Sequence, residues 1–264
     1  MADTSFTESL SERNRVVAEL RRQKLELKPY TTLRNTLDGS SIFILGSGTS
    51  LYDYYKDGSL SSVFKYPVIT INASIMLTDW ESGPKTGRYW ISNDALCRRW
   101  SYWIKVLKSQ LHGIIRDSWS RYFREVRDFY VFTARNKLNG EIQEDEDGLV
   151  GCSSVPSALD LAIQMGCNNV FLLGVDHYFK SGKRYFWEYL TKGDQPAHKR
   201  LQMHPERHQK QIFKQNDTAY DNLNKVAQKR NMGVYNCNLH SNVDIFKKIN
   251  LSESFDIIGQ QHDK

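Results

Sequence analysis

Three side chains around the most apolar stretch of the chain have the chemistry of a group-transfer site. Asp176 ends the run Asn169–Val175, and Tyr178 and Tyr185 follow closely. A tyrosine hydroxyl can donate a hydrogen bond to a leaving phosphate, and a carboxylate can hold Mg²⁺ through its oxygens. All three are therefore candidate catalytic residues. A tyrosine packed across the edge of a sheet is the structural alternative.

Three histidines, His198, His204 and His208, lie within one polar, aromatic segment. A histidine whose pKa is near neutrality is the usual general base for deprotonating a hydroxyl group. The three histidines could also bind a metal, although gaps of 6 and 4 residues in an unpatterned loop are weak evidence for it, and a solvated polar loop explains the composition equally well. Each of the three is therefore a candidate for the base of a transfer reaction.

A glycine turn precedes these residues in the chain. The apolar run 41–45 leads directly into Gly46-Ser47-Gly48-Thr49-Ser50. A strand that feeds a glycine-rich turn leaves backbone N–H groups free, and such a nest binds phosphate. The third glycine of the dinucleotide fingerprint is absent, and the Gly-Lys-Ser/Thr of a P-loop does not follow. A phosphate-binding turn and a plain tight turn therefore both remain open.

Polar residues also stand at the ends of other expected elements. Asn72, Asn93 and Asp94 follow two further strand-like runs, and open α/β sheets bind their ligands at such ends. Asn72 could bond a base or ribose, and Asp94 a ribose hydroxyl or a metal. Ser153 and Ser154 open an expected helix, whose N-terminus suits a phosphate or carboxylate. Turn capping and helix capping are the alternatives.

The elements that must position these residues alternate between strand and helix. This order predicts an α/β, Rossmann-like domain, whose mostly parallel sheet carries helices on both faces. Residues 177–212 lack periodicity, which predicts a long lid-like loop. The expected strands are 41–45, 66–72, 88–92, 129–133, 169–175 and 233–237, and the expected helices are 5–29, 95–128, 153–165 and 216–229.

The composition of the chain limits how it can be organised into domains. It has 264 residues, of which 40% are hydrophobic and 12% aromatic, enough for one large core and unlike a disordered protein. We expect an N-terminal helical extension (1–34), a nucleotide-binding transferase domain (35–250) and a C-terminal tail (251–264). The net charge of +6 attracts anions, although solubility alone also explains it.

The expected compartment is the cytoplasm. The sequence begins without a basic stretch followed by an apolar run, and no apolar stretch is long enough to span a bilayer. Four cysteines without a CxxC pair suggest reduced thiols. Residues 98–137 are basic and aromatic and could touch a membrane surface peripherally, or form a half-buried helix. No recognisable nucleic-acid module accompanies them, so nucleic acid is not an expected partner.

The order of these segments resembles the family named for the archaeal 6-hydroxymethylpterin diphosphokinase over roughly residues 35–250. A second, fainter likeness is to bacterial sialyltransferases that use a CMP-activated sugar. Ser47 and Thr49 stand where the turn usually has Asn and Pro. The segments that carry the resemblance are Ile44–Leu51, Ile69–Asn72, Tyr89–Asp94, Gly151–Gly166, Val170–His177, Lys192–His198 and Val234–Cys237.

The sialyltransferase likeness implies a role for particular residues. Asn72 would contact the nucleotide, and Tyr178 and Tyr185 would steady the leaving phosphate. The catalytic histidine of those enzymes falls near Lys214, which is not a histidine. One of the histidines at 198, 204 and 208 would then substitute for it.

Three functions follow as hypotheses. The first is glycosyl transfer from a CMP-type nucleotide sugar to a hydroxyl acceptor in surface glycan synthesis. The alternative is a Mg²⁺–ATP-dependent diphosphokinase acting on a hydroxymethylpterin-like alcohol, with Asp94 or Asp176 holding the metal. The second alternative is a catalytically degenerate nucleotide-binding module. Mg²⁺ is expected only for the diphosphokinase.

Overall fold

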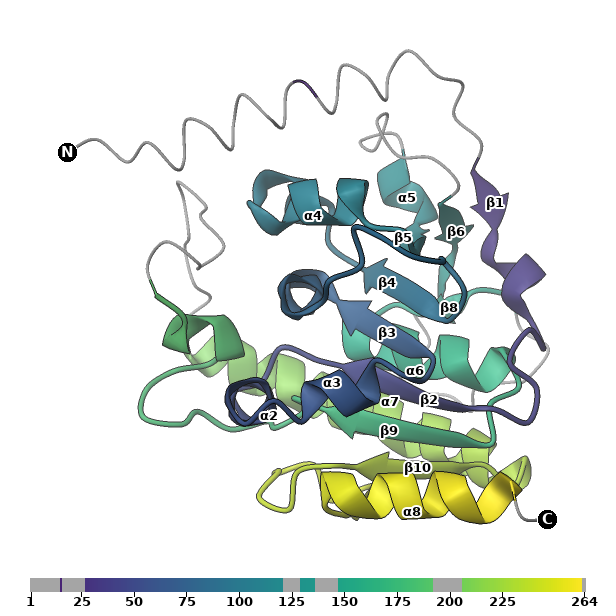
Figure 1. Ribbon diagram of the computed structural model, residues 1–264, viewed down its shortest axis with the longest axis vertical. Coiled ribbons are helices and arrows are strands. Elements are labelled where there is room, and N and C mark those ends of the chain that lie inside the picture. Colours follow the sequence, from purple (N-terminus) through teal and green to yellow (C-terminus); the bar gives the residue numbers. More distant parts are fainter. Residues whose placement is uncertain (1–14, 16–26, 121–128, 136–146, 192–205, 263–264) are drawn as a thin grey trace.

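The core of the fold is one large parallel sheet. The computed structural model describes residues 15, 27–120, 129–135, 147–191 and 206–262. Its main sheet has nine strands in the order β1-β6-β5-β4-β3-β2-β9-β10-β11, and every neighbouring pair is parallel (Figure 1). The expected α/β, Rossmann-like fold with a parallel sheet and helices on both faces is confirmed.

The bounds of the elements follow the chain. The strands of the main sheet are β1 (Lys28–Pro29), β2 (Ser41–Leu45), β3 (Val68–Ile71), β4 (Arg88–Ser92), β5 (His112–Arg116), β6 (Tyr130–Phe132), β9 (Asn169–Leu173), β10 (Gly233–Asn236) and β11 (Lys247–Lys248). Strands β7 (Ala134–Arg135) and β8 (Leu149–Val150) pair separately. The α-helices are α2 (Ser50–Lys56), α3 (Leu60–Val63), α4 (Tyr102–Lys108), α5 (Asp117–Ser120), α6 (Ser154–Gln164), α7 (Glu206–Lys229) and α8 (Leu251–His262). The 3₁₀ helices are η1 (Tyr30–Leu33), η2 (Asn72–Leu77), η3 (Ala95–Arg99) and η4 (Phe186–Tyr189).

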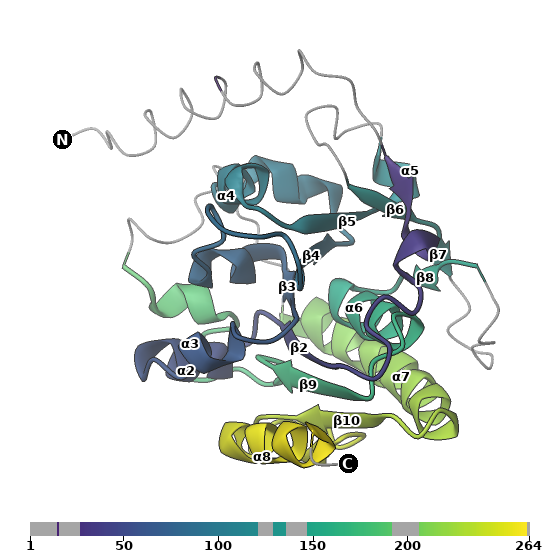
Figure 2. The same ribbon diagram turned by 45° about the vertical axis from the view of Figure 1, so that its right-hand side comes forward.

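Each face of the sheet has its own apolar core. On β2, Ile42 and Ile44 belong to the apolar cluster that includes α6 and α7, whereas Phe43 and Leu45 belong to the cluster that includes α2, α3, α4 and α8. Helices α6 and α7 lie on one face of the sheet and α2 and α3 on the other (Figures 1 and 2). Successive side chains of a strand point to opposite faces, so a strand covered on both sides must be apolar throughout. This is why the central strands read as continuous hydrophobic runs in the sequence.

The direction in which successive strands are added to the sheet reverses between β2 and β9. After β2 it passes through α2 and α3 on one face to reach β3, whereas α7 precedes β10 on the opposite face (Figure 2). Strands β2 and β9 are nevertheless neighbours in the sheet. Their carboxyl ends therefore form a topological switch point, which is where open α/β sheets hold their ligands.

The sequence analysis missed strand β5 (His112–Arg116), which lies inside the expected helix 95–128. The surrounding residues have a helical composition, but Ile114 and Ile115 are buried between β4 and β6. Gly113 is required there, since a Cβ on it would lie 2.3 Å from the ring of Phe129. Long-range packing has therefore overridden local propensity.

Helix α7 begins at residue 206, ten residues before its expected start at 216, so the expected loop 177–212 is too long. Its inner face carries the buried polar residues Gln209 and Asn216, which hide the apolar periodicity of a helix. The segment 192–205 lies outside the described residues. The 3₁₀ helix η4 packs into the core through Phe186, whose N–H donates to the carbonyl of Ser47 over 3.1 Å.

The folded domain extends beyond the expected limits 35 and 250. Strand β1 pairs with β6, and Tyr30 and Leu33 of η1 are buried in the core. At the other end, the expected tail is helix α8, which buries Leu251 and Ile258 against the sheet. Of the expected helix 5–29, the part before residue 27 lies outside the described residues except for Arg15.

Candidate functional site

A cleft of about 460 Å³ opens beyond the carboxyl ends of the central strands. We call it the strand-end cleft. The sequence-predicted residues that line it are Ser47, Gly48, Asn72, Asn93, Asp94, Ser153, Ser154, Asp176, Tyr178 and Tyr185. Residues that the sequence analysis did not assign to a site also line it, among them Arg116, Cys152, His177, Arg184, Gln209 and Asn216.

Other predicted site residues lie elsewhere. Gly46, Thr49 and Ser50 are buried and do not line this cleft, although Ser50 lines a second cavity. His198 and His204 lie outside the described residues. His208 is in the first turn of α7, and its side chain is likewise not described.

The glycine turn encloses the carboxylate of Asp176. Oδ2 accepts hydrogen bonds from the N–H of Ser50 at 2.8 Å and from Oγ1 of Thr49 at 3.2 Å. Oδ1 accepts from Oγ of Ser50 at 2.5 Å and from Nδ2 of Asn238 at 2.9 Å. An ionised carboxylate has about four lone-pair sites, and these four donors use all of them. The carboxylate of Asp176 therefore occupies the part of the turn that Thr49 and Ser50 form.

Gly46 and Gly48 have no room for a side chain, because Gly174 and Asp176 lie very close to them. A Cβ on Gly46 would lie 2.4 Å from the carbonyl oxygen of Gly174, and one on Gly48 would lie 2.5 Å from Oδ2 of Asp176. The N–H of Gly48 donates to the carbonyl of Gly174 over 2.8 Å. Of the residues in the turn, only Ser47 and Gly48 line the cleft, so only these two can contact a ligand there.

The N-terminus of α6 also opens into the strand-end cleft. Ser153, the residue before the helix, makes no capping hydrogen bond, and its hydroxyl donates instead to Oδ1 of Asn216 at 2.8 Å. The first turn carries no acidic side chain. The hydroxyl of Ser154 accepts from the N–H of Asn93 at 2.9 Å, which links the helix to the end of β4. The partial positive charge of the helix end is therefore open to an anion.

Five buried polar atoms of the cleft-lining residues have no hydrogen-bond partner in the described part of the chain. They are Oδ1 of Asn72, Oδ1 of Asn93, Nε of Arg116, Nδ1 of His177 and Oε1 of Gln209. Nearly all buried polar atoms in proteins are hydrogen-bonded, so a group of five at one cleft calls for an explanation. A ligand with both donors and acceptors would satisfy them.

Two residues of the cleft wall have strained backbones. Asn72 has a φ of 50° and His177 a φ of 52°. This left-handed region is costly for residues other than glycine and is often found at binding and catalytic sites. At Asn72 the conformation turns the chain out of β3, and the carbonyl of Asn72 accepts from Nε1 of Trp90 at 3.0 Å.

Both predicted tyrosines present protonated hydroxyls. Burial raises the pKa of Tyr178, and the neighbouring Asp176 carboxylate raises it further. Burial also raises the pKa of Tyr185. The hydroxyl of Tyr185 accepts from Nε2 of Gln209 at 2.7 Å, which leaves its own proton free to be donated. Both groups therefore suit an anionic ligand at neutral pH.

Cys152 lines the cleft but is poorly suited to be a nucleophile. Burial raises the pKa of its thiol to about 11, and backbone hydrogen bonds offset this only in part. The thiolate is the reactive form, and it is scarce at neutral pH when the pKa is this high. Sγ lies 3.8 Å from Oδ1 of Asn216.

The predicted ligands do not form a complete Mg²⁺ site. Asp176 has its acceptor sites filled, and the exposed Asp94, whose Oδ1 accepts from the N–H of Leu96 at 2.7 Å, is a single carboxylate. Within the described ranges, no group of three or more His, Cys, Asp and Glu side chains could hold a metal ion. We therefore derive no chemical step through a metal.

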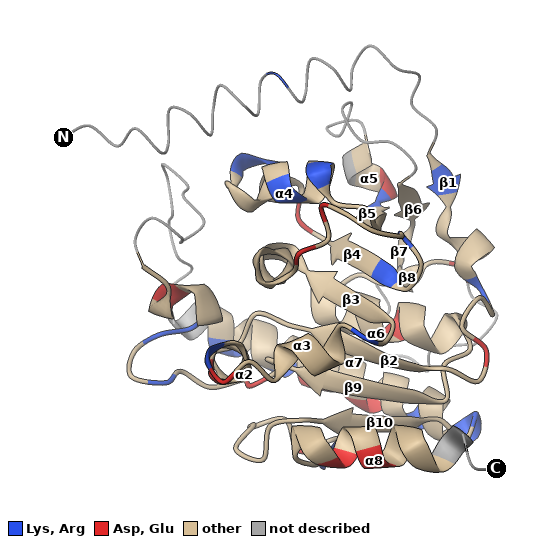
Figure 3. Cartoon of the chain, viewed as in Figure 1, with Lys and Arg blue, Asp and Glu red and all other residues tan. Residues whose placement is uncertain are grey.

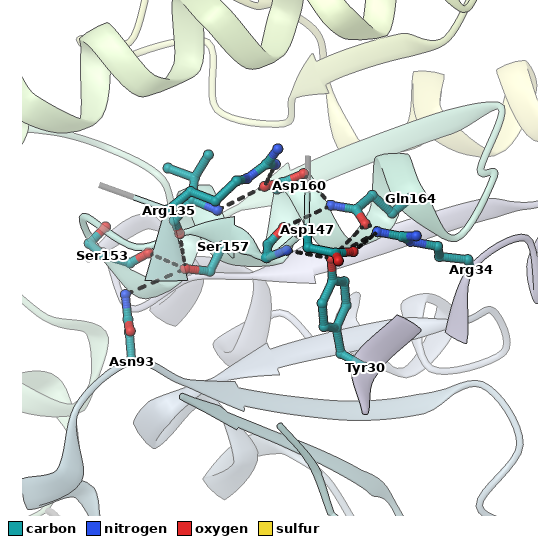
Figure 4. Close-up of polar contacts among 11 residues, drawn as sticks. Tyr30, Arg34, Asn93, Arg135, Asp147, Ser153, Ser157, Asp160 and Gln164 are labelled. Atoms are coloured by element: carbon teal, nitrogen blue, oxygen red, sulfur yellow. Dashed lines mark hydrogen bonds and ion pairs between the residues drawn. The ribbon is translucent and has the colours of Figure 1, made fainter. Parts of the chain in front are cut away.

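A buried polar network holds the start of α6 in place. Arg135 of β7 and Gln164 both point toward Asp160 of α6 (Figure 4). Asp160 forms a buried ion pair with Arg135 and accepts from Nε2 of Gln164 at 3.0 Å and from the N–H of Val150 at 2.8 Å. Because Val150 leads into Gly151, the network fixes the approach to the Ser153 end of the helix.

A second cavity of about 520 Å³ is lined by Ser50 and Asn238, two of the residues that donate hydrogen bonds to Asp176. It shares Tyr178 with the strand-end cleft. Lys180, which lines it, pairs with Asp53 at 2.9 Å, so this cation is already neutralised. The strand-end cleft, which has the open helix end and Arg116, is the better site for an anion.

Sequence reasoning missed Arg116 because it missed β5. The apolar pair Ile114-Ile115 before Arg116 is the signal that could have revealed a strand end at this position. Gln209 and Asn216 gave no signal, since they lie on the inner face of a helix whose start was placed too late. His177 follows Asp176 directly and was visible in the sequence without a role.

No protein-family model matches the sequence, and no curated protein matches it. The resemblance to the diphosphokinase family and to the sialyltransferases therefore stays a prediction. Among the helices that the structure describes, none has the length and apolar character needed to cross a membrane. Helix α4, in the basic segment 98–137, carries the basic residues Lys105 and Lys108 (Figure 3), and membrane contact there also stays a prediction.

Proposed function

We propose that this chain is a transferase that binds a nucleotide-activated substrate in the strand-end cleft. The observation that carries the proposal is the meeting of an open helix N-terminus with five buried polar atoms that lack a hydrogen-bond partner, at the switch point of a parallel sheet. Helix ends at this place in α/β folds bind phosphate groups. The favoured reaction is glycosyl transfer from a CMP-type sugar to a hydroxyl acceptor.

In this proposal the phosphate lies between the α6 N-terminus and Arg116. The guanidinium supplies charge, while the helix end supplies backbone donors. Asn72 and Asn93 offer carbonyl oxygens to donors of the base or ribose. Ser47 and Gly48 border the same space from the glycine turn.

The tyrosines favour transfer of the group attached to the phosphate. Tyr178 and Tyr185 both line the cleft and both keep their protons, so they can stabilise the charge that develops on a departing phosphate. The diphosphokinase alternative relies on metal ligation, for which Asp176 has no acceptor site left and Asp94 offers one carboxylate alone. Glycosyl transfer therefore has the better support.

A panel of nucleotides in a thermal-shift assay tests the proposal. We expect CMP to raise the melting temperature by about 5–10 °C at a concentration of about 100 times its Kd, because it binds only the folded state. UMP, AMP and ATP are measured beside it, each with and without Mg²⁺. A shift that appears only with ATP and Mg²⁺ would favour the diphosphokinase, and no shift with any nucleotide would refute both.

Replacing Arg116 with glutamine tests the place of the phosphate. We expect Arg116→Gln to weaken CMP binding about 10- to 100-fold, because a charge-assisted hydrogen bond contributes about 1.5–3 kcal/mol. Binding of cytidine, which has no phosphate, should change little. Titration calorimetry with both ligands measures the difference.

The matched control is Arg99→Gln, since Arg99 is exposed and does not line the cleft. It should leave both affinities unchanged. Equal losses for CMP and cytidine in Arg116→Gln would mean that Arg116 shapes the cleft and does not bind the phosphate.

A further inference from the structure

His177 stands in the wall of the strand-end cleft in a tightly fixed position. Its ring stacks on Phe213 with the centroids 4.4 Å apart, and it also stacks on Tyr220 at 5.7 Å. Only 8% of the side chain is exposed. Its backbone has a positive φ, which costs free energy for a histidine and directs the ring toward α7. The imidazole is therefore held in one orientation at the edge of a ligand site.

Asp217 of α7 accompanies this ring. Its Oδ1 lies 3.0 Å from Nδ1 of His177. Phe213, Asp217 and Tyr220 are spaced by one helical turn each and so share one face of the helix. No other hydrogen-bond partner of either atom is present in the described ranges, and the two are not yet in line for a hydrogen bond. Such pairs are often misaligned without substrate and tighten when it binds.

The contact with Asp217 distinguishes the two ring nitrogens. A carboxylate beside Nδ1 favours the proton on that nitrogen, which leaves Nε2 with its lone pair. Nε2 is then the nitrogen with a free lone pair, in a residue that lines the cleft. A histidine oriented in this way by a carboxylate can act as a general base.

We propose that His177 is the catalytic base of the transfer reaction and that Asp217 is its positioning residue. The inference rests on the proposed function. In the step, the acceptor oxygen forms a bond to the anomeric carbon of the sugar, and the bond from that carbon to the phosphate oxygen breaks. The electron pair of that bond leaves with the nucleoside monophosphate. Nε2 takes the proton of the acceptor and later releases it to solvent.

The positive φ of His177 makes a sharp test possible. Glycine adopts this backbone conformation without strain, so His177→Gly should fold and leave a space of imidazole size beside Phe213. The assay is CMP release from CMP-N-acetylneuraminate with water as the acceptor, measured beside the Kd for CMP. We expect turnover to fall by about 10²- to 10⁴-fold with the Kd within about threefold of the wild-type value. Added imidazole should restore part of the rate.

Two controls separate the base from a structural role. Ser181→Gly places glycine at another position with a φ of 52°, which is exposed and outside the cleft, and should keep full turnover and gain nothing from imidazole. Asp217→Asn should lower turnover less than His177→Gly does, and should not respond to imidazole. Asp221→Asn, one turn further along α7, should leave turnover unchanged.

Each result decides between the two proposals. Turnover that persists in His177→Gly would overturn the base assignment and leave the nucleotide site standing. Wild-type protein that binds CMP but releases none from the sugar nucleotide would also overturn it. Wild-type protein that binds no nucleotide would remove the proposed function, and the base assignment with it.

Discussion

Asp176→Ala should lower the free energy of unfolding by about 3 kcal/mol or more. The substitution leaves the buried N–H of Ser50 and the amide of Asn238 without their acceptor, and each unsatisfied buried group costs about 1–3 kcal/mol. Urea denaturation followed by circular dichroism measures the loss, provided that the slope of the transition stays constant. We also expect CMP binding to weaken, because Ser47 and Gly48 lie in the same turn.

Two variants calibrate this result. Asp176→Asn keeps the volume but turns an NH₂ group toward donors, so it should be destabilised by roughly half as much. Asp53→Ala removes an exposed carboxylate that pairs with Lys180 and should change stability by less than about 1 kcal/mol. An Asp176→Ala protein of wild-type stability would mean that the carboxylate does not hold the turn.

Asp160→Ala should cost about 3–5 kcal/mol of stability. It removes the carboxylate that faces the guanidinium of Arg135 in a site where both side chains are more than nine-tenths buried. The N–H of Val150 and the amide of Gln164 lose an acceptor at the same time. Urea denaturation again measures the effect, and the start of α6 should become more accessible to hydrogen exchange.

The double variant Arg135→Met/Asp160→Leu gives the opposite expectation. Replacing both charges with apolar groups avoids the isolated buried charge, so the double variant should be more stable than Asp160→Ala. The control is Asp244→Ala, which breaks an exposed pair with Lys248 and should cost less than about 1 kcal/mol. If the double variant is no more stable than Asp160→Ala, the loss reflects packing around α6 and not an isolated charge.

Strong local patterns made much of the fold predictable. The strands at 41–45 and 88–92 were placed at their observed bounds, because each is an apolar run closed by small or polar residues. Strand β5 and the first turns of α7 were missed, because their identity depends on burial against distant segments. A single sequence shows the period of its apolar residues, but not which polar residues a fold will bury.

The location of the candidate site was more predictable from the sequence than the role of each of its residues. Asn72 and Asn93, at strand ends, and Ser153, at the start of a helix, do converge on one cleft, as the predicted parallel sheet requires. The sequence could not show that Asp176 faces the glycine turn of its own chain. Nor could it show that His177 lies against Asp217. Both contacts join residues that are far apart in the chain, and the sequence does not give the relative orientation of the elements that carry them.

The pairing of β2 with β9 also constrains the order in which the molecule can form. Ser41 and Asn169 are register partners in the sheet, although they are 128 positions apart in the chain. Contacts of such long range form slowly, because the intervening chain must first be closed into a loop. During synthesis β2 therefore waits with one edge unpaired until β9 has emerged. The cleft, which needs the ends of both strands, is among the last parts of the domain to appear.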